Sequence, residues 1–221
     1  MARLARVVIP GHPHHVTQRG NGRARTFFDD GDYALYRDLL AANCKAAGVE
    51  VWAWCLMPNH VHLILVPSDP DGLRHALARV HRSYAGTIQA RRKRTGHFWQ
   101  GRFGAVVMDE QHLAAALRYV SLNPVRARLV QRAQDWRWSS TRAHLRGRDD
   151  GLTVLGRSAI VFLISPICWQ PNRKPICSAR CVLRRVLDDH WEIAAFSPVS
   201  NARPDASSSR PSGPKPAVED E

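Results

Sequence analysis

The sequence lacks the features that mark secreted and membrane-bound proteins. Its five cysteines are an odd number without the spacing of a disulfide framework, and its N-terminus lacks the charged and then apolar layout of a signal peptide. The longest strongly apolar stretch of the C-terminal part, Ala159 to Ile164, is far shorter than the about 20 residues of a membrane-spanning helix. We therefore predict a cytoplasmic protein with free thiols and no membrane partner.

Lysine is also scarce, because the 32 basic residues include only Lys45, Lys93, Lys174 and Lys215. The formal net charge is nevertheless +13, since arginine supplies the other basic side chains. A positive charge of this size predicts a polyanionic partner, and the planar arginine side chain suits paired contacts to phosphate and guanine. Nucleic acid is the leading candidate for that partner.

Acidic residues are absent from one long stretch, Gly72 to Met108, which is rich in arginine. Within it, the basic run Arg91 to Arg94 is followed by the ring-bearing residues His97, Phe98 and Trp99. Basic side chains beside aromatic rings favour single-stranded nucleic acid, because phosphates pair with the cations and unpaired bases stack on the rings. The alternative interpretation is a solvated helix face.

Apolar spacing predicts six elements in the order strand, helix, strand, strand, helix, strand. A first strand resumes near His15, and two further strands form a hairpin around Pro58. This order fits an α+β protein with the ferredoxin-like split βαβ layout, an antiparallel sheet with two helices on one face. The predicted bounds after the first strand are helix Asp30–Ala47, strands Val49–Leu56 and His60–Val66, a helix from about Asp71 to Arg94 and strand Phe103–Met108.

An additional helix outside this basic unit is predicted from Glu110 to about Leu122, and it carries Tyr119. Pro124 should end this helix, because proline disfavours a helical conformation in the residue before it. We assign residues 1–150 to one folded domain, since beyond about Gly151 the regular apolar pattern decays. Residues 151–196 then form a divergent segment of undetermined fold, and residues 197–221 a Pro/Ser/Ala-rich disordered tail.

Two short motifs carry the candidate chemistry. His60 and His62 are two apart on a predicted strand, so their side chains share a face and can converge on one metal ion. Tyr119 and Asn123 are four apart on a predicted helix, so a phenol and an amide oxygen can reach one point. Each motif alone also fits a structural role, as surface histidines or as a core tyrosine with a helix-capping asparagine.

Together, the segments LMPNHVHL (residues 56–63) and RYVSLNPVRA (residues 118–127) closely resemble those of the REP-associated tyrosine transposases. These proteins belong to the wider HUH family of single-strand transposases. The resemblance extends in the same order to HHVTQRGN (residues 14–21) and FWQGRF (residues 98–103), and it covers about residues 4 to 146. Beyond about Gly151 the chain departs from the family, because the expected apolar helical ending is missing.

The resemblance implies that His60, His62 and Asn123 bind a divalent ion, Mg²⁺ or Mn²⁺, and that Tyr119 attacks a DNA phosphodiester. The product would be a 5′-phosphotyrosine with a free 3′-hydroxyl on single-stranded or hairpin DNA, formed by a monomer or a homodimer. The donor set alone, two nitrogens and one amide oxygen, favours Mn²⁺ or Zn²⁺ over Mg²⁺. The residues predicted to contact DNA are Arg19, Arg82, Arg91, Arg92, Lys93, Arg94, Trp99, Arg102, Arg118 and Arg126.

Two other functions remain as alternatives to this enzyme. A catalytically silent protein could recognise repeat hairpins through the same basic surface, and a metal-dependent phosphodiesterase could use water as its nucleophile. Tyr33, Tyr36 and Tyr84 are rival nucleophiles. The first two fit core-facing positions of a helix, and Tyr84 has no metal-ligand residue type near it in the sequence.

Overall fold

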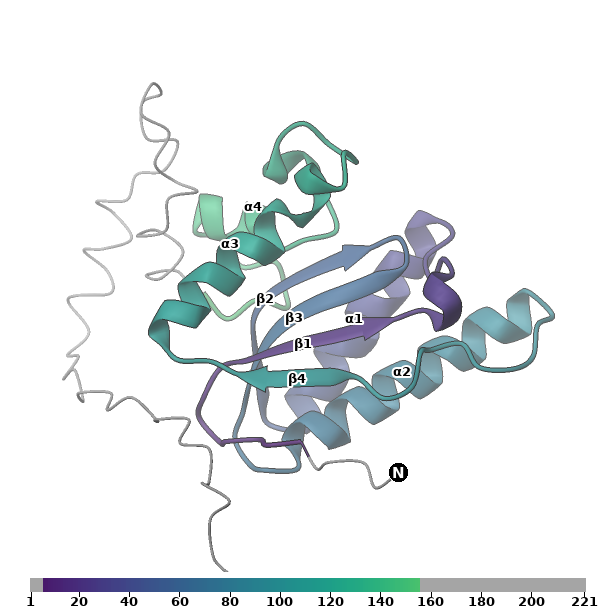
Figure 1. The fold of residues 1–221 in the computed structure, drawn as a ribbon, viewed down its shortest axis with the longest axis horizontal. Helices are drawn as coiled ribbons and strands as arrows, with labels where there is room; N and C mark the ends of the chain where they lie inside the picture. The colour runs from purple at the N-terminus through teal and green to yellow at the C-terminus, as the bar shows by residue number, and fades with distance from the viewer. Residues whose placement is uncertain (1–5, 156–221) are drawn as a thin grey trace, which may run out of the picture. The chain divides into compact units, whose positions relative to one another are not determined.

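The structure, a computed structural model, describes residues 6–155 of the chain (Figure 1). Apart from residues 151–155, the predicted divergent segment and tail lie outside the described residues. The elements are β1 His14–Arg19, η1 Asn21–Arg23, α1 Asp30–Ala46, β2 Val49–Met57, β3 His60–Pro67, α2 Gly72–Arg91, β4 Gly104–Val107, α3 Glu110–Arg126, η2 Ala133–Asp135 and α4 Thr141–Arg146.

The strands form one antiparallel sheet in the spatial order β2-β3-β1-β4. β1 therefore lies between β3 and β4, although β3 and β4 follow it at very different distances along the chain. This is the strand order of the ferredoxin-like split βαβ unit. The predicted α+β architecture is confirmed, and so is the hairpin of β2 and β3 around Pro58.

Alternate side chains of the sheet supply two separate apolar clusters. Val16 and Leu63 belong to a cluster that also contains the buried faces of α1 and α2. Cys55 and Ile64 belong to a second cluster, on the other face, to which α3 contributes Leu117. Figure 1 shows α1 and α2 side by side along one face of the sheet, and α3 away from them. The sheet is thus covered on both faces.

The prediction that Pro124 ends the last long helix is wrong, because α3 continues to Arg126 with the proline inside it. Proline removes only one N–H donor, its own, and the helix tolerates this loss where the next turn keeps its bonds. Here the N–H of Ala127 donates to the carbonyl of Asn123, and that of Leu129 to the carbonyl of Pro124. Pro124 is itself buried, so packing also favours the continued helix.

Two other boundaries differ from the predictions. α2 ends at Arg91 rather than near Arg94, because Lys93 has a φ of 49° and so leaves the helical region. β4 is limited to Gly104–Val107. In the part of the chain that the structure describes, no helix is long and apolar enough to cross a membrane.

Candidate functional site

The register of the central strands gathers polar side chains on the face of the sheet that α3 covers. β1 and β3 are antiparallel, with Thr17 opposite His62 and Arg19 opposite His60. Because side chains alternate between faces along a strand, His15 shares this face with these four residues. The side chains of His15, Thr17, Arg19, His60 and His62 therefore lie beside the apolar cluster under α3.

The three histidines on this face are in direct contact. The Nε2 atom of His15 lies 3.0 Å from the Nδ1 atom of His62, and their rings stack. The rings of His60 and His62 meet edge to face with centroids 4.8 Å apart. The Nδ1 atom of His60 lies 2.6 Å from the Oδ1 atom of Asn59, which can only accept a hydrogen bond. His60 therefore carries its proton on Nδ1 and presents an Nε2 lone pair.

Burial keeps these imidazoles neutral at physiological pH. It lowers the pKa of His60 to about 4, with a smaller effect from the charge of Arg19. It lowers the pKa of His62 to about 3, with further lowering by His60, His15 and Arg19. The pKa of His15 is also lowered by burial. A neutral imidazole is the form that can bind a metal ion, and these three are neutral near pH 7.

Tyr119 reaches the histidines from α3. Its ring centroid lies 5.2 Å from that of His62 at an interplanar angle of 84°, and 6.2 Å from that of His15. The guanidinium carbon of Arg126 lies 5.2 Å from the tyrosine ring centroid. Tyr119 is 41% exposed, so its phenol stays accessible to a substrate in solvent. The exposed Tyr119 side chain thus lies beside the buried imidazole of His62, the partly buried imidazole of His15 and the cation of Arg126.

Asn123 lies one turn further along α3 and is buried. Its side chain makes no hydrogen bond within residues 6–155. Among those residues, no group of three or more His, Cys, Asp or Glu side chains is placed to hold a metal ion.

The donors that remain are the two imidazoles and the Asn123 amide. The Nε2 atom of His62 is buried and has no hydrogen-bond partner in the described chain. Buried polar atoms are normally paired, so this atom is the one that a bound ion would satisfy. This unpartnered nitrogen, in a ring that contacts His60, fits a divalent ion at the two histidines.

A family profile described as "Transposase IS200 like" matches residues 11–123, more than half of the chain. The chain belongs to the IS200-like transposase family. The matched range includes both histidines, Tyr119 and Asn123. The family resemblance of the sequence motifs is thereby confirmed.

Two individual proteins are also similar to this chain. A Haemophilus influenzae protein, named as a REP-associated tyrosine transposase, is 26% identical over 116 residues, which are 48% of this chain and 66% of the relative. The match thus spans just under two thirds of that relative's length. The solved structure of a REP-associated tyrosine transposase bound to a REP hairpin has a TM-score of 0.57 to this IS200-like chain at 20% identity. That similarity covers 70% of this chain and 92% of the other, and it supports the fold.

The predicted DNA contacts of this IS200-like family member fall into two regions. Arg19, Arg118 and Arg126 lie near the tyrosine, on the end of β1 and on α3, and all three are exposed. Arg82 and Arg102 are exposed elsewhere, on α2 and in the segment before β4. None of these five arginines forms an ion pair within residues 6–155.

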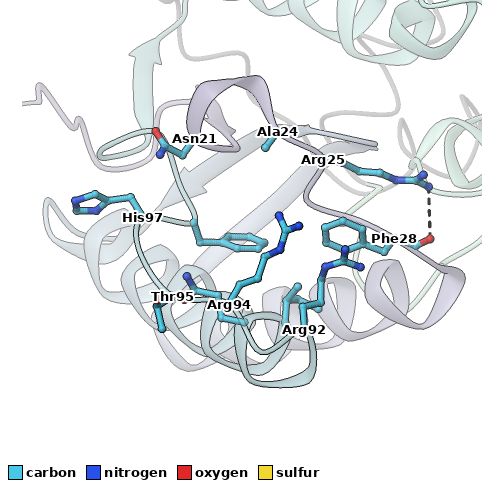
Figure 2. Close-up of a pocket in the computed structure, with 11 residues that line it drawn as sticks. Asn21, Ala24, Arg25, Phe28, Arg92, Arg94, Thr95 and His97 are labelled. Carbon is cyan, nitrogen blue, oxygen red and sulfur yellow. Dashed lines mark hydrogen bonds between the residues drawn. The ribbon is translucent and has the colours of Figure 1, made fainter.

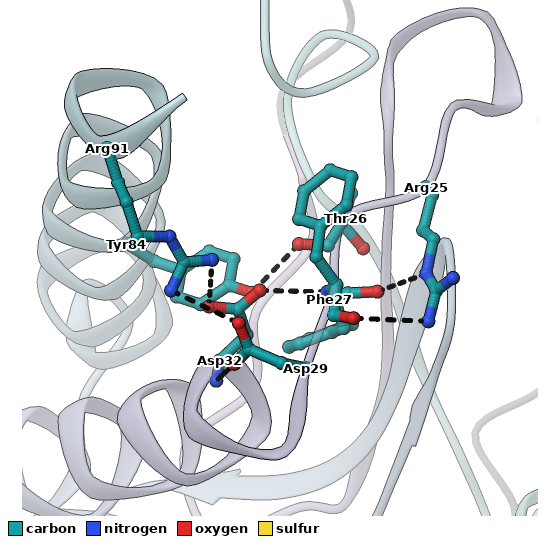
Figure 3. A network of polar contacts seen from close by, with 8 residues as sticks. Arg25, Thr26, Phe27, Asp29, Asp32, Tyr84 and Arg91 are labelled. Carbon is teal, nitrogen blue, oxygen red and sulfur yellow. Dashed lines mark hydrogen bonds and ion pairs between the residues drawn. The ribbon is translucent and has the colours of Figure 1, made fainter. Parts of the chain in front are cut away.

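The basic residues Arg91 to Arg94, at the end of α2 and just beyond it, have different surroundings. Arg91 pairs with the buried carboxylate of Asp32 and lies 3.5 Å from that of Asp29, so it is part of the fold (Figure 3). Arg92 covers the ring of Phe28, and the exposed Lys93 and Arg94 have no acidic partner in the described part of the chain (Figure 2).

Trp99 is also packed into the protein. Its indole N–H donates to the carbonyl of His81 at 2.9 Å, and its ring contacts Tyr84 and Phe98. A base cannot stack on both faces of this ring without displacing those contacts. Trp99 does follow the basic run in the sequence, but the sequence could not show that its ring packs against Tyr84 and Phe98.

The rival tyrosines are all buried on the opposite face of the sheet, among α1 and α2. Burial raises the pKa of Tyr33 to about 12 and raises those of Tyr36 and Tyr84 further. None of the three is therefore available to DNA. The residue that sequence reasoning undervalued is His15, and its signal was the alternation of His15, Thr17 and Arg19 along the first strand.

Proposed function

We propose that this protein is a metal-dependent single-strand DNA endonuclease and strand transferase with Tyr119 as its nucleophile. The observation that carries the proposal is the edge-on contact of the exposed Tyr119 ring with the buried, neutral His62. Membership of the IS200-like transposase family supports it independently. The net charge of +13 suits a nucleic acid substrate.

The reaction would proceed by in-line transfer of a phosphoryl group. The Tyr119 phenol oxygen attacks the phosphorus, the bond from phosphorus to the 3′-oxygen breaks, and the 3′-oxygen leaves as a hydroxyl after taking up a proton. The 5′-phosphate of the downstream strand stays on the tyrosine. This covalent bond keeps the energy of the phosphodiester, so attack by a second 3′-hydroxyl can rejoin DNA and release the tyrosine.

The protein's own groups would position and neutralise this reaction. A divalent ion, Mg²⁺ or Mn²⁺, held by His60, His62 and Asn123, would supply charge neutralisation at the scissile phosphate. His15 would orient the ring of His62 through their hydrogen bond. Arg126 lies over the Tyr119 ring, so its cation would stabilise negative charge on the phenol oxygen and attract the phosphate.

The substrate would be single-stranded DNA that contains a hairpin. The structure of a relative bound to a REP hairpin supports this class, although the likeness to this chain is one of fold. The exposed arginines near the tyrosine, Arg19, Arg118 and Arg126, would contact phosphates of the strand being cut.

The test is a search for the covalent intermediate. Labelled hairpin oligonucleotides are incubated with the protein and Mn²⁺ or Mg²⁺, and the products are separated on a denaturing gel. We expect a protein–DNA adduct that disappears in Tyr119→Phe and with a chelator. Tyr33→Phe, which removes a buried phenol oxygen on the other face, should retain the adduct. Cleavage by Tyr119→Phe would instead indicate water as nucleophile, and binding without cleavage would indicate a silent DNA-binding protein.

A further inference from the structure

A cavity of about 240 Å³ lies between the segment after β1 and the C-terminal end of α2. Figure 2 shows Asn21 and Arg25 on one side of it and Arg92, Arg94 and His97 on the other. The rings of Phe28 and Phe98 also line the cavity, and no acidic residue does. Its volume is below the about 300–1,000 Å³ typical of pockets for drug-sized ligands, which suits a group of the size of one nucleobase.

The cations of this cavity are not neutralised by the protein. Arg25 donates to the backbone carbonyls of Phe27 and Phe28, which fixes its guanidinium without removing its charge. The guanidinium carbon of Arg92 lies over the ring of Phe28, 3.8 Å from the ring centroid. Arg94 is exposed and forms no ion pair and no side-chain hydrogen bond in the described part of the chain. The cavity thus combines aromatic surface with excess positive charge.

The walls of the cavity are held by a buried polar network (Figure 3). The carboxylate of Asp32 accepts a hydrogen bond from the backbone N–H of Phe28 at 2.8 Å and pairs with Arg91. The hydroxyl of Tyr84 donates to the carbonyl of Thr26 at 2.8 Å. These contacts fasten the segment that carries Arg25 and Phe28 to α2, so the cavity exists before a ligand binds.

The same segment is joined to the candidate active site. Gly20 follows directly on Arg19, the β1 residue opposite His60, and its N–H donates to the carbonyl of Asn59 at 2.9 Å. The amide of Asn59 donates to the carbonyl of Arg23 at 3.1 Å. The turn that precedes His60 therefore rests on the chain that lines the cavity.

We propose that the cavity binds one unpaired nucleotide of the DNA, with its base on the Phe28 and Phe98 side and its phosphate at Arg94. Aromatic rings and guanidinium planes stack on unpaired bases of any sequence, and an amide such as that of Asn21 can pair with a base edge. This inference rests on the proposed function, because it takes the substrate to be DNA with unpaired nucleotides.

The experiment compares two hairpins, one with a short single-stranded extension and one with blunt ends, by fluorescence anisotropy at fixed salt with a chelator present. Arg94→Gln removes the free cation, and Ala24→Leu enlarges a cavity-lining side chain without changing the charge. Both should weaken binding of the extended hairpin by about tenfold or more and leave the blunt hairpin within about threefold. Arg79→Gln, an exposed arginine of α2 outside the cavity, is the matched control and should affect both hairpins equally.

Abasic sites then locate the bound nucleotide. Each nucleotide of the extension is replaced in turn by an abasic site. We expect one position at which the missing base weakens binding to the wild-type protein but does not further weaken binding to the Ala24→Leu variant. Equal effects of Arg94→Gln or Ala24→Leu on both hairpins, or the absence of such a position, would overturn the proposal. The anisotropy assay contains a chelator and measures binding, not cleavage. Failure to form the Tyr119 adduct would therefore refute the proposed enzyme activity but would leave the binding result unchanged.

Discussion

The Nε2 atom of His15 lies 3.0 Å from the Nδ1 atom of His62, so the first strand holds the ring of a proposed metal ligand. If the N–H of this pair belongs to His62, the Nε2 atom of His62 keeps its lone pair, and that atom is the buried one without a partner. The register of β1 against β3 creates this contact. We therefore assign His15 as a positioning residue of the site.

Loss of His15 should weaken metal use more than folding. Because groups that orient metal-ligating histidines contribute about 10–100-fold to affinity, we expect His15→Ala to raise the Mn²⁺ concentration for half-maximal adduct formation by about that factor. His15→Gln, which can still hydrogen-bond to His62, should recover most of the loss. His75→Ala, an exposed histidine of α2, is the control. An unchanged Mn²⁺ dependence in His15→Ala would refute the positioning role.

Mn²⁺ alone should stabilise the protein if His60, His62 and Asn123 form a metal site. An ion that binds only the folded state raises the free energy of unfolding by mass action, by about 2.7 kcal/mol at 100 times its dissociation constant. We expect this rise in urea denaturation of the wild type without DNA, and its loss in His60→Ala and Asn123→Ala. An equal rise in Asn123→Ala would remove that residue from the ligand set.

Stability should fall as the pH is lowered toward 4, partly because of His81. This buried histidine lies 3.0 Å from the hydroxyl of Tyr36, and burial lowers its pKa to about 3. The unfolded chain takes up a proton at this histidine near pH 6.5 whereas the folded protein does not, so protonation favours unfolding between these values. The loss from pH 7 to pH 5 is about 2 kcal/mol from this group. In urea denaturation, His81→Gln should lose correspondingly less over that interval, and an identical loss would contradict the account.

We expect substitutions of the neighbouring residues Arg91 and Arg92 to have different effects, the first on stability and the second on DNA binding. Arg91→Gln removes the partner of the buried Asp32 carboxylate, so we expect a loss of about 1–3 kcal/mol in the free energy of unfolding. Arg92→Gln should leave stability nearly unchanged and reduce the salt dependence of DNA binding by about one phosphate contact. Urea denaturation and salt titrations of hairpin affinity measure the two effects. Similar behaviour of both variants would contradict the division of the basic run.

The sequence predicted the fold well, because local patterns determine most of it. The aromatic or β-branched runs Val49–Leu56 and His60–Val66 and the helical spacing after Asp30 predicted the element order. The ferredoxin-like layout inferred from that order agrees with the observed strand order. The end of α3 was wrong, since Pro124 acts as a helix stop only where packing does not favour continuation.

The sequence predicted less of the candidate site than of the fold. Spacing alone could relate His60 to His62 within one strand, but the contact of His15 with His62 depends on the pairing of two strands. Likewise, only the structure shows that Arg91, at the end of α2, pairs with Asp32, while Arg94, just beyond the helix, lines the cavity. The cavity joins segments around Arg25 and Arg94, which are distant in the chain and carry no shared motif.

The most direct test of the central claim is to identify the amino acid that carries the DNA. The adduct formed with a hairpin oligonucleotide and Mn²⁺ is digested with nuclease and trypsin, and the peptides are sequenced by mass spectrometry. We expect a nucleotide joined through its 5′-phosphate to Tyr119 in the peptide Tyr119–Arg126. A nucleotide on another residue, or cleaved DNA with every tyrosine unmodified, would contradict the tyrosine mechanism.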